Sequence, residues 1–394
     1  MTGAFQRVPA AALSAAAAAC TSIGVDAATV ELSPTATTIT ASTDSASIVV
    51  RVPGDGTGRA RRAVAVSALH TQPDSSRVTL TAVEDGTLQV DRRTAARATS
   101  GAARRHAHRL DADVTVTLEP ADLIALLTAV SSHSKSVTEN LDGKVHLKIA
   151  SDPSDDHATL TATAAGSFAA ATNTVAGILV HGASGAESEV WLHGPALRAG
   201  TAALNARAKK WKLSCFVSGV GHRVQLSDGV TDITTVVDQA LVPDIVAPFA
   251  APDRARCWDF DITDVPALAA FLNRLPPAAA GTSPFVQIRN ERGTQDLLHQ
   301  ARITAQINGR AVPCVARRAA SRGVATSCAE DVAVDVPLVQ FRALVATAAA
   351  HKAHTMVLRG YAPYRTMSKL FAHPTLGTEP RFTAVTVAQV PVAT

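Results

Sequence analysis

The chain of 394 residues has few aromatic side chains, which make up 4% of it, although 47% of it is hydrophobic. Its core must therefore be built mainly from Ala, Val, Leu and Ile, a composition that suits sheets and small helices better than an aromatic ligand pocket. Long apolar runs are also missing, since no stretch approaches the roughly eighteen strongly apolar residues that a membrane span needs. A chain of this length suits two or three domains.

The chain also lacks a large excess of charge of either sign. Lys and Arg number 37 against 33 Asp and Glu, and no polycationic tail is present. Bulk charge therefore does not explain any binding to nucleic acid, and a role on DNA would need local basic patches.

The cysteines do not form a recognisable framework. An odd number without a CxxC pair argues against structural disulfides or zinc and favours a reducing, cytoplasmic setting. The run "PAAALSAAAAAC" could be mistaken for a signal or lipoprotein segment, but Ala is only weakly apolar and is the best helix former, so we predict a helix over 9–22. The five cysteines are Cys20, Cys215, Cys257, Cys314 and Cys328.

Motifs that carry chemistry are absent from the sequence, which contains no GxxxxGK[ST], GxSxG or HExxH. His351 and His354 are three residues apart and His106 and His108 flank one alanine, but neither pair has a third ligand nearby, so surface histidines are favoured over a zinc site. We expect no catalysis, no metal and no cofactor. An enzyme whose site is scattered across loops stays open as a third alternative.

A repeated order of elements is the main positive signal. After the helix over 9–22 come a strand "ATVELSP", the alternating stretch 38–52 and a turn at "VPGDGTG". A second unit has a short helix or helical turn, a strand over 78–83, a turn at 84–86 and a strand over 88–90. A stretch similar to 38–52 returns at 158–177, in the same place after a helix and a first strand. The same order of one strand, one helix and several strands occurs about six times, at roughly 50 to 70 residues each. It predicts three α+β domains of two half-units each.

The later helices show the same patterning. Pro120 opens a predicted helix with Leu123, Leu126, Leu127 and Val130 on one face. A helix in "VPALAAFLNRLPP" should end at its proline pair, and "VAVDVPLVQFRALVATAAAHKAHTMVLRG" predicts strand, helix and strand. A basic Ala-rich stretch and a segment with three prolines separate the thirds, which gives domains at 1–113, 114–252 and 253–394. Alternation is poor over 281–329, and its strand layout stays open.

Three segments resemble the bacterial β sliding clamp, the β subunit of DNA polymerase III. They are "LSPTATTITASTDSASIVVRVP", then "VWLHGPALRAGTAALNARAKKWKLS" leading to "LVPDI", and finally "VDVPLVQFRALVATAAA" followed by "QVPV". The resemblance implies three similar clamp domains in a crescent, which dimerises head to tail into a ring with helices inside and strands outside. It implies a processivity factor without catalytic activity. Its partners would be duplex DNA, a DNA polymerase, a clamp loader and a second copy of the chain, with no membrane.

A sliding ring must attract phosphates without reading bases, so Lys and Arg are expected on its helices. The macrodipole favours cations at the C-terminus of any helix, so each such residue also has a purely structural interpretation. The helix over 9–22 contains no basic residue, which predicts a nearly neutral stretch of inner wall. The predicted DNA-facing residues are Arg198, Arg207, Lys209, Lys210 and Lys212 around one helix, and Lys135, Arg274, Arg342 and Lys352 near the ends of others.

The resemblance also implies an apolar pocket for short partner peptides between the second and third domains. The loop "TATAAGSFAA" lacks the Asp, His and Arg of the family's usual Thr-Asp-Gly-His-Arg-Leu. Near the C-terminus, Val-Pro-Val stands where the family usually has Met-Pro-Met, and a Val pair is stiffer and smaller than a Met pair. Either the partner peptides carry a different motif or fewer partners bind. Alternatively, the same residues belong to ordinary core packing and form no pocket. A clamp-like interaction scaffold that does not encircle DNA is the competing hypothesis. The pocket residues are Thr163, Ser167, Phe168, Pro243, Pro248, Val390, Pro391 and Val392.

Overall fold

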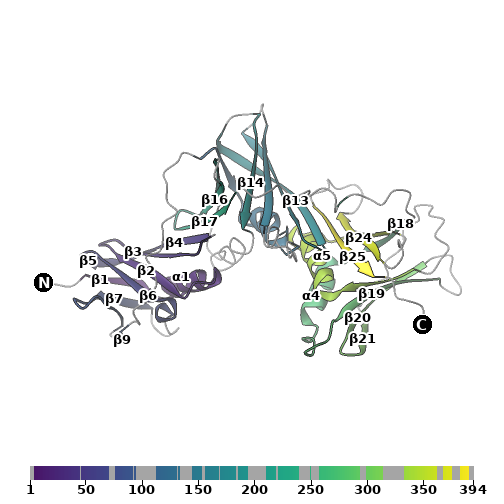
Figure 1. Cartoon of the computed structure of the whole chain (residues 1–394), viewed down its shortest axis with the longest axis horizontal. Helices are drawn as coiled ribbons and strands as arrows, with labels where there is room; N and C mark the ends of the chain where they lie inside the picture. Colours follow the sequence, from purple (N-terminus) through teal and green to yellow (C-terminus); the bar gives the residue numbers. More distant parts are fainter. Residues whose placement is uncertain are drawn as a thin grey trace. The chain divides into compact units, whose positions relative to one another are not determined.

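The structure is a computed structural model of the whole chain (Figure 1). Strands dominate it, and among the described residues no helix is long and apolar enough to cross a membrane. The chain divides into two compact units, Met1–Ile124 with His146–Leu160 and Ala176–Leu241, and Ala125–Val145 with Thr161–Val175 and Val242–Thr394. The residues described are 4–44, 46–70, 76–91, 93–94, 112–130, 132–133, 144–152, 156–167, 169–182, 185–193, 210–218, 221–238, 249, 257–292, 299–313, 332–361, 367–374 and 382–389.

The first unit begins with strand β1 (Phe5–Pro9), which the sequence does not predict, followed by the helix expected over 9–22. Helix α1 (Ala10–Ser22) buries Leu13, Ala16, Ala17 and Cys20, which recur at the helical period and are fully buried. The helical turn of the second half-unit is a 3-10 turn, η1 (Val66–Leu69). The strands are β1 (Phe5–Pro9), β2 (Ala27–Leu32), β3 (Ala36–Ser42), β4 (Ala46–Pro53), β5 (Asp55–Thr57), β6 (Ala60–Ala65), β7 (Arg77–Ala82), β8 (Leu88–Val90) and β9 (Arg93–Thr94).

The stretch 38–52 forms the antiparallel hairpin β3–β4, in which Thr40 pairs with Val49. Its counterpart 158–177 falls on β12 (His157–Ala165) and β13 (Ala169–His181), so both stretches form hairpins that follow a helix and one strand. The helix predicted at Pro120 is confirmed, but only Pro120–Leu123 (α2) is α-helical, and Ile124–Ala129 continues as a π-helix. Its predicted apolar face is buried at Leu123, Leu126, Leu127 and Val130.

Antiparallel pairing joins eight strands of the first unit into one sheet. Its order is β10, β15, β16, β17, β4, β3, β2 and β6, and β17 meets β4 with Ile233 opposite Ile48. A second sheet has the order β5, β1, β7, β8 and β9. The further strands named here are β10 (Val114–Leu118), β11 (Lys144–Ser151), β14 (Glu187–His193), β15 (Trp211–Ser218), β16 (Gly221–Ser227) and β17 (Thr231–Asp238).

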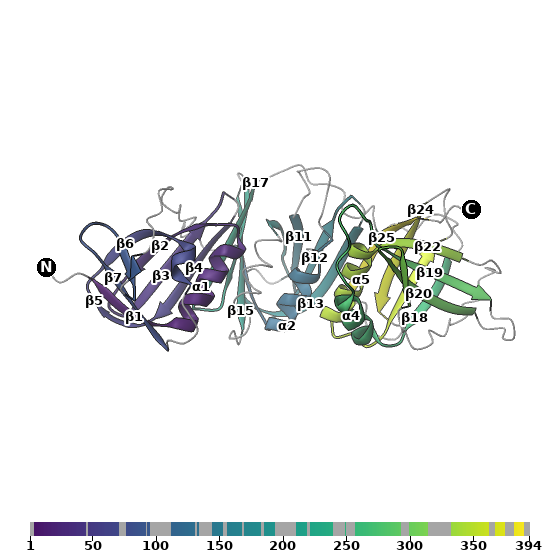
Figure 2. The same cartoon turned by 90° about the horizontal axis from the view of Figure 1, so that it is seen from below.

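Among the described residues of the second unit, helices α4 (Val265–Arg274) and α5 (Leu338–Ala350) contact each other (Figure 2). The Asp264 side chain caps α4 by accepting a hydrogen bond of 2.9 Å from the Ala267 amide, and the helix ends before Pro276 and Pro277, as predicted. Its strands are β18 (Cys257–Ile262), β19 (Phe285–Arg292), β20 (His299–Ile307), β21 (Arg310–Pro313), β22 (Val332–Pro337), β23 (Met356–Tyr361), β24 (Met367–Pro374) and β25 (Phe382–Gln389).

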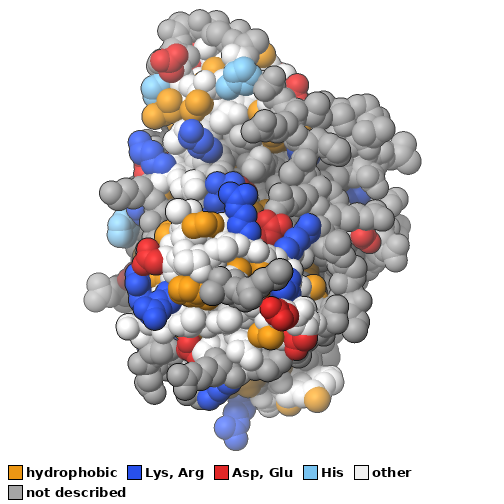
Figure 3. Space-filling model, turned by 90° about the vertical axis from the view of Figure 1, so that its left-hand side faces the viewer, with side chains coloured by type: hydrophobic (Ala, Val, Ile, Leu, Met, Phe, Trp, Pro, Cys, Tyr) orange, Lys and Arg blue, Asp and Glu red, His pale blue; other side chains and the backbone are white. Residues whose placement is uncertain are grey.

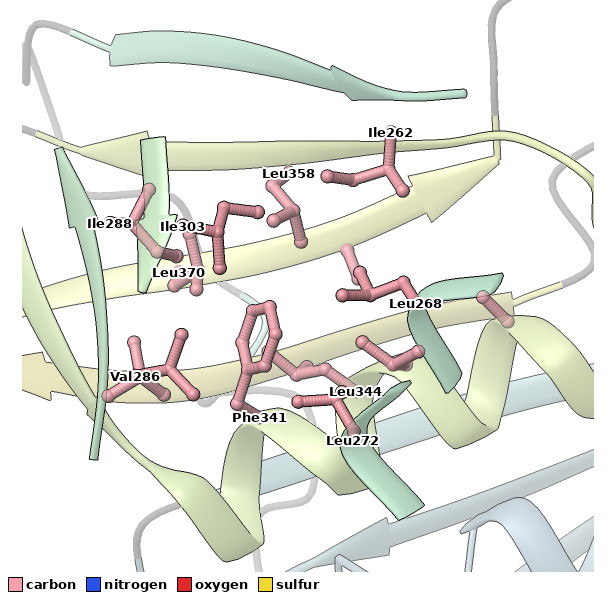
Figure 4. Packing of buried hydrophobic residues seen from close by; sticks show 14 of the residues in the cluster. Ile262, Leu268, Leu272, Val286, Ile288, Ile303, Phe341, Leu344, Leu358 and Leu370 are labelled. Carbon is pink, nitrogen blue, oxygen red and sulfur yellow. The ribbon is translucent and has the colours of Figure 1, made fainter. Parts of the chain in front are cut away.

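Two strand arrangements enclose the core of the second unit. One runs β18, β23, β24, β25 and the first half of β13, and the other runs β21, β20, β19 and β22. Between them and the helices lies the main core, in which Phe341 of α5 is fully buried among aliphatic side chains (Figure 4). Strands β19 to β21 thus supply part of the layout that the sequence leaves open over 281–329, of which 293–298 and 314–329 lie outside the described residues.

Candidate functional site

Five of the nine predicted DNA-facing residues can be placed. Lys210 and Lys212 are exposed at the start of β15, on either side of the fully buried Trp211. The Lys210 Nζ lies 3.3 Å from a carboxylate oxygen of Glu119, but both side chains are more than half exposed, so this ion pair contributes little. Lys135, Arg198, Arg207 and Lys209 lie outside the described residues.

Arg274 and Arg342 have different environments although both were predicted as inner-wall cations. Arg274 is exposed at the end of α4, and its Nε donates to the Ala270 carbonyl of its own helix at 3.2 Å. Arg342 of α5 is half-buried, and its Nε and Nη2 donate to the Leu272 carbonyl at 3.1 and 2.7 Å. The Leu272 carbonyl lies in the last turn of α4, where the Leu275 amide donates to it only at 3.4 Å, so Arg342 ties α5 to the C-terminal turn of α4.

Replacing Arg342 with alanine is expected to lower the free energy of unfolding by more than about 1 kcal/mol, because it removes two charge-assisted hydrogen bonds. Arg274→Ala is the matched control, with an expected change within about 0.5 kcal/mol because Arg274 is exposed and its hydrogen bond to Ala270 lies within its own helix. Urea unfolding of the two variants measures the difference. Equal midpoints would show that the contact to Leu272 does not stabilise the helix pair.

The described helices carry little charge. Helices α1, α4 and α5 together contain Arg274 and Arg342 as their charged residues, and α1 contains none. The outward positions of α1 include Ala11, Ala18 and Thr21. Lys352 is exposed just after α5, in the left-handed region at φ 53. The prediction of a neutral first helix therefore agrees with its exposed surface.

Charges of both signs are mixed on the face of the molecule drawn in Figure 3, where Lys and Arg side chains lie among Asp and Glu. Within the first unit, Arg77 pairs with Asp55 at 3.2 Å and Arg61 with Glu31 at 3.3 Å. Such ion pairs at the surface neutralise charge locally rather than building a field of a single sign.

Two of the predicted pocket residues are described, and both belong to the β12–β13 hairpin. Thr163 is buried on β12, with its Oγ1 3.1 Å from the Thr172 Oγ1 across the hairpin. Ser167 is exposed in the connecting turn, which the Gly166 amide closes by donating to the Ala169 carbonyl at 2.7 Å. The other six, Phe168, Pro243, Pro248, Val390, Pro391 and Val392, lie outside the described residues.

Next to this turn lies a second apolar group that is separate from the main core. We call Ala165, Ala170, Phe371 and Val385 the outer cluster. Side chains alternate along a strand, and the neighbours Ala171, Leu370 and Ala384 belong to the main core, so the outer cluster lies on the opposite face of the sheet. The strand register places Phe371 opposite Val385 and Val385 opposite Ala170.

The same row of the sheet continues from the outer cluster into a polar group. Arg359 pairs with Phe371 across β23 and β24, and its guanidinium donates to both carboxylate oxygens of Asp259 at 2.7 and 2.8 Å. His373 stacks on Phe371 with ring centroids 5.6 Å apart. Burial lowers the pKa of His373, the Arg359 charge lowers it further and Asp259 opposes this. Sequence reasoning missed Phe371 and Val385, although both lie in apolar runs whose two alternating faces are both buried.

In the described part of the chain, no three His, Cys, Asp or Glu residues lie together so that they could hold a metal ion. His351 stacks on Phe382 with centroids 5.3 Å apart, while His354 is exposed. Cys20 and Cys215 are buried free thiols, and burial raises the pKa of Cys20 to about 12. A thiol with so high a pKa is a poor nucleophile.

Comparisons with known proteins identify the fold. No protein-family model and no curated protein matches the sequence. Among solved structures, a putative DNA polymerase III β subunit from Eubacterium rectale has a TM-score of 0.68 at 10% identity, with 100% of both chains covered. The sliding clamp of Bacillus subtilis has a TM-score of 0.66 at 12% identity, again over 100% of both chains. The DNA polymerase III β subunit of Thermotoga maritima has a TM-score of 0.68 at 14% identity, over 99% of this chain and 100% of that one.

At identities this low, the similarity establishes the fold and does not by itself establish the activity. The resemblance predicted from the sequence is confirmed at that level: from end to end, this chain has the fold of the bacterial DNA polymerase III β subunits, the DNA sliding clamps.

Proposed function

We propose that this chain is a DNA sliding clamp, a processivity factor that encircles duplex DNA and tethers a replicative polymerase. In this proposal 1–113, 114–252 and 253–394 are three similar domains of a crescent, and two crescents close head to tail into a ring. The observation that supports it is a fold match that extends over 99–100% of this chain and all of the clamp chains compared. The role is that of an accessory subunit without catalytic activity, placed on DNA by a clamp loader.

A closed ring holds its partner at the template by topology rather than by tight contact. A polymerase that dissociates stays at high effective concentration and rebinds. The ring needs only weak, sequence-independent attraction to phosphates, which solvated Lys and Arg side chains provide. The nine predicted cations are proposed for this role. Among them Lys210, Lys212, Arg274 and Lys352 are exposed, and Arg342 acts mainly on α4.

The outer cluster is the proposed floor of the partner pocket. It is apolar, it is built from Ala and Val around one aromatic ring, and it adjoins the turn that carries Ser167. Short peptides bind such surfaces by inserting apolar anchors, with polar groups at the rim setting specificity. We place Thr163, Phe168, Pro243, Pro248 and the C-terminal Val390, Pro391 and Val392 around it.

Retention on circular DNA tests the ring. The protein is expected to run in light scattering at close to twice its chain mass of 40.7 kDa. It should stay on nicked circular plasmid through gel filtration in moderate salt and be lost when the plasmid is linearised, because only a topological link depends on DNA ends. A monomer at micromolar concentration that leaves circular and linear DNA equally fast would overturn the proposal.

Charge reversal of Lys209 and Lys210 to Glu tests the basic segment. The variant is expected to lose DNA at lower salt, with the slope of log affinity against log salt reduced by about two. The matched control reverses Lys144 and Lys148 of β11, which changes net charge equally outside the proposed inner wall.

The same experiment separates the clamp from a clamp-like scaffold that binds protein partners without encircling DNA. The uncharged surface of α1 favours the scaffold. If both double variants and the unmodified protein behave identically on DNA, the scaffold is the better description.

A further inference from the structure

The outer cluster is more deeply buried than its position on the sheet explains. Its four side chains project from the face opposite the main core, yet none of them is more than 8% exposed. Other positions on the same face of the same strands, such as Lys369 and Thr383, are half-buried. His373 stacks on Phe371 from the same strand, and another part of the chain must cover the rest of the cluster.

Phe249 is a described side chain that packs against it. The residue is half-buried and comes from none of the four strands that carry the cluster (β12, β13, β24 and β25), since it lies between β17 and β18 in the sequence. An aromatic ring over a floor of Ala, Val and Phe is the same kind of contact that an apolar peptide anchor would make there. Phe249 and a partner's anchor would therefore compete for one surface.

We propose that Phe249 is a built-in competitor that occupies the outer cluster, so that a partner peptide binds only by displacing it. The inference rests on the proposed function of the cluster as the partner pocket. When a site is free in only a fraction of the molecules, the apparent dissociation constant of its ligand is the intrinsic constant divided by that fraction. The Phe249 contact therefore lowers the affinity for every partner. Partners with weak anchors are excluded, and partners with strong anchors still bind.

The chain's own segment serves as the probe. A fluorescent peptide of residues 244–252, DIVAPFAAP, is titrated into the full-length protein and into the variant Phe249→Ala, with fluorescence anisotropy as the readout. The variant is expected to bind the peptide about tenfold more tightly than the unmodified protein, because its cluster is uncovered. The peptide with its Phe replaced by Ala should bind neither protein.

Phe271→Ala is the matched control, since Phe271 is another half-buried phenylalanine of the second unit but packs against the main core. It should bind the peptide no better than the unmodified protein. Equal binding by the unmodified protein and by Phe249→Ala, or tighter binding by both alanine variants, would overturn the proposal.

Photo-crosslinking gives a test that does not depend on the stability of the alanine variant. Benzoylphenylalanine at position 249 is expected to crosslink to β24 or β25 near Phe371 and Val385, and crosslinks confined to other segments would overturn the proposal. The retention of the unmodified protein on circular DNA is measured in parallel. Failure there counts against the ring alone, whereas failure of the peptide and crosslinking results counts against Phe249 alone.

Discussion

Replacing Phe341 with alanine is expected to lower the free energy of unfolding of the second unit by about 3–5 kcal/mol. Phe341 is fully buried, and Figure 4 shows its ring pointing from α5 into the middle of the main core. Its neighbours Val286, Leu344 and Leu370 are themselves fully or almost fully buried, so they cannot move far to fill the space that the ring leaves. The loss of unfolding free energy therefore has two parts, the lost burial of the ring and the cavity that it leaves.

Urea or thermal unfolding followed by circular dichroism measures this effect. The control is Val339→Ala on the same helix, where the side chain is 67% exposed and the change should stay within about 0.5 kcal/mol. Similar shifts for the two variants would show that Phe341 is not central to the core. Because Arg342 is the next residue, a loosened α5 is also expected to release its contact to Leu272.

Acidification from pH 6.5 to pH 4 is expected to cost the protein about 3 kcal/mol of stability through His133 alone. His133 is almost fully buried, and its Nε2 lies 3.0 Å from the Thr347 hydroxyl, which donates to the Ala343 carbonyl at 2.9 Å. Burial lowers the pKa of His133 from 6.5 to about 4, and the Ala343 carbonyl opposes this only in part.

The sign of the effect follows from which state binds the proton. Below pH 6.5 the unfolded chain takes up a proton at His133, whereas the folded chain does so only near pH 4. The stability that His133 contributes is therefore greatest above pH 6.5 and is lost as the pH is lowered towards 4. His373, whose pKa burial also lowers, acts in the same direction.

The variant His133→Gln isolates the contribution of His133, because glutamine does not titrate and can still bond to Thr347. Unfolding free energies of both proteins are measured from pH 7 to pH 4. The unmodified protein should lose about 3 kcal/mol more than the variant over this range. Parallel pH profiles would show that His133 is accessible to protons in the folded state.

Local sequence patterns predicted helices and turns correctly where the residues that form the pattern are close neighbours in the chain. The spacing of Leu13, Ala16 and Cys20 is helical, and all three are buried on one face of α1. The proline pair after Arg274 stops α4, and the turn at 84–86 separates β7 from β8. In each case the signal lies within about one or two turns of the residues it organises.

Pattern was less informative where a strand is apolar on both faces. Phe371 and Leu370 look alike in the sequence, yet one belongs to the outer cluster and the other to the main core. The helix at Pro120 was predicted by its apolar face, but its change to a π-helix was not. Asn173 of β13 donates to the Ala125 carbonyl in that π-helix, a contact between residues far apart in the chain.

The sequence by itself determined the helices α1, α4 and α5, the uncharged surface of α1 and the resemblance to the sliding clamps, because each of these signals lies in a short stretch of neighbouring residues. Tertiary structure alone decided that Arg342 serves the Leu272 carbonyl, that β13 changes partner from β25 to β10 along its length, and that Phe249 packs on the outer cluster. Each of these contacts joins residues dozens of positions apart. Their energies arise only when folding brings the partners together, so no local pattern records them.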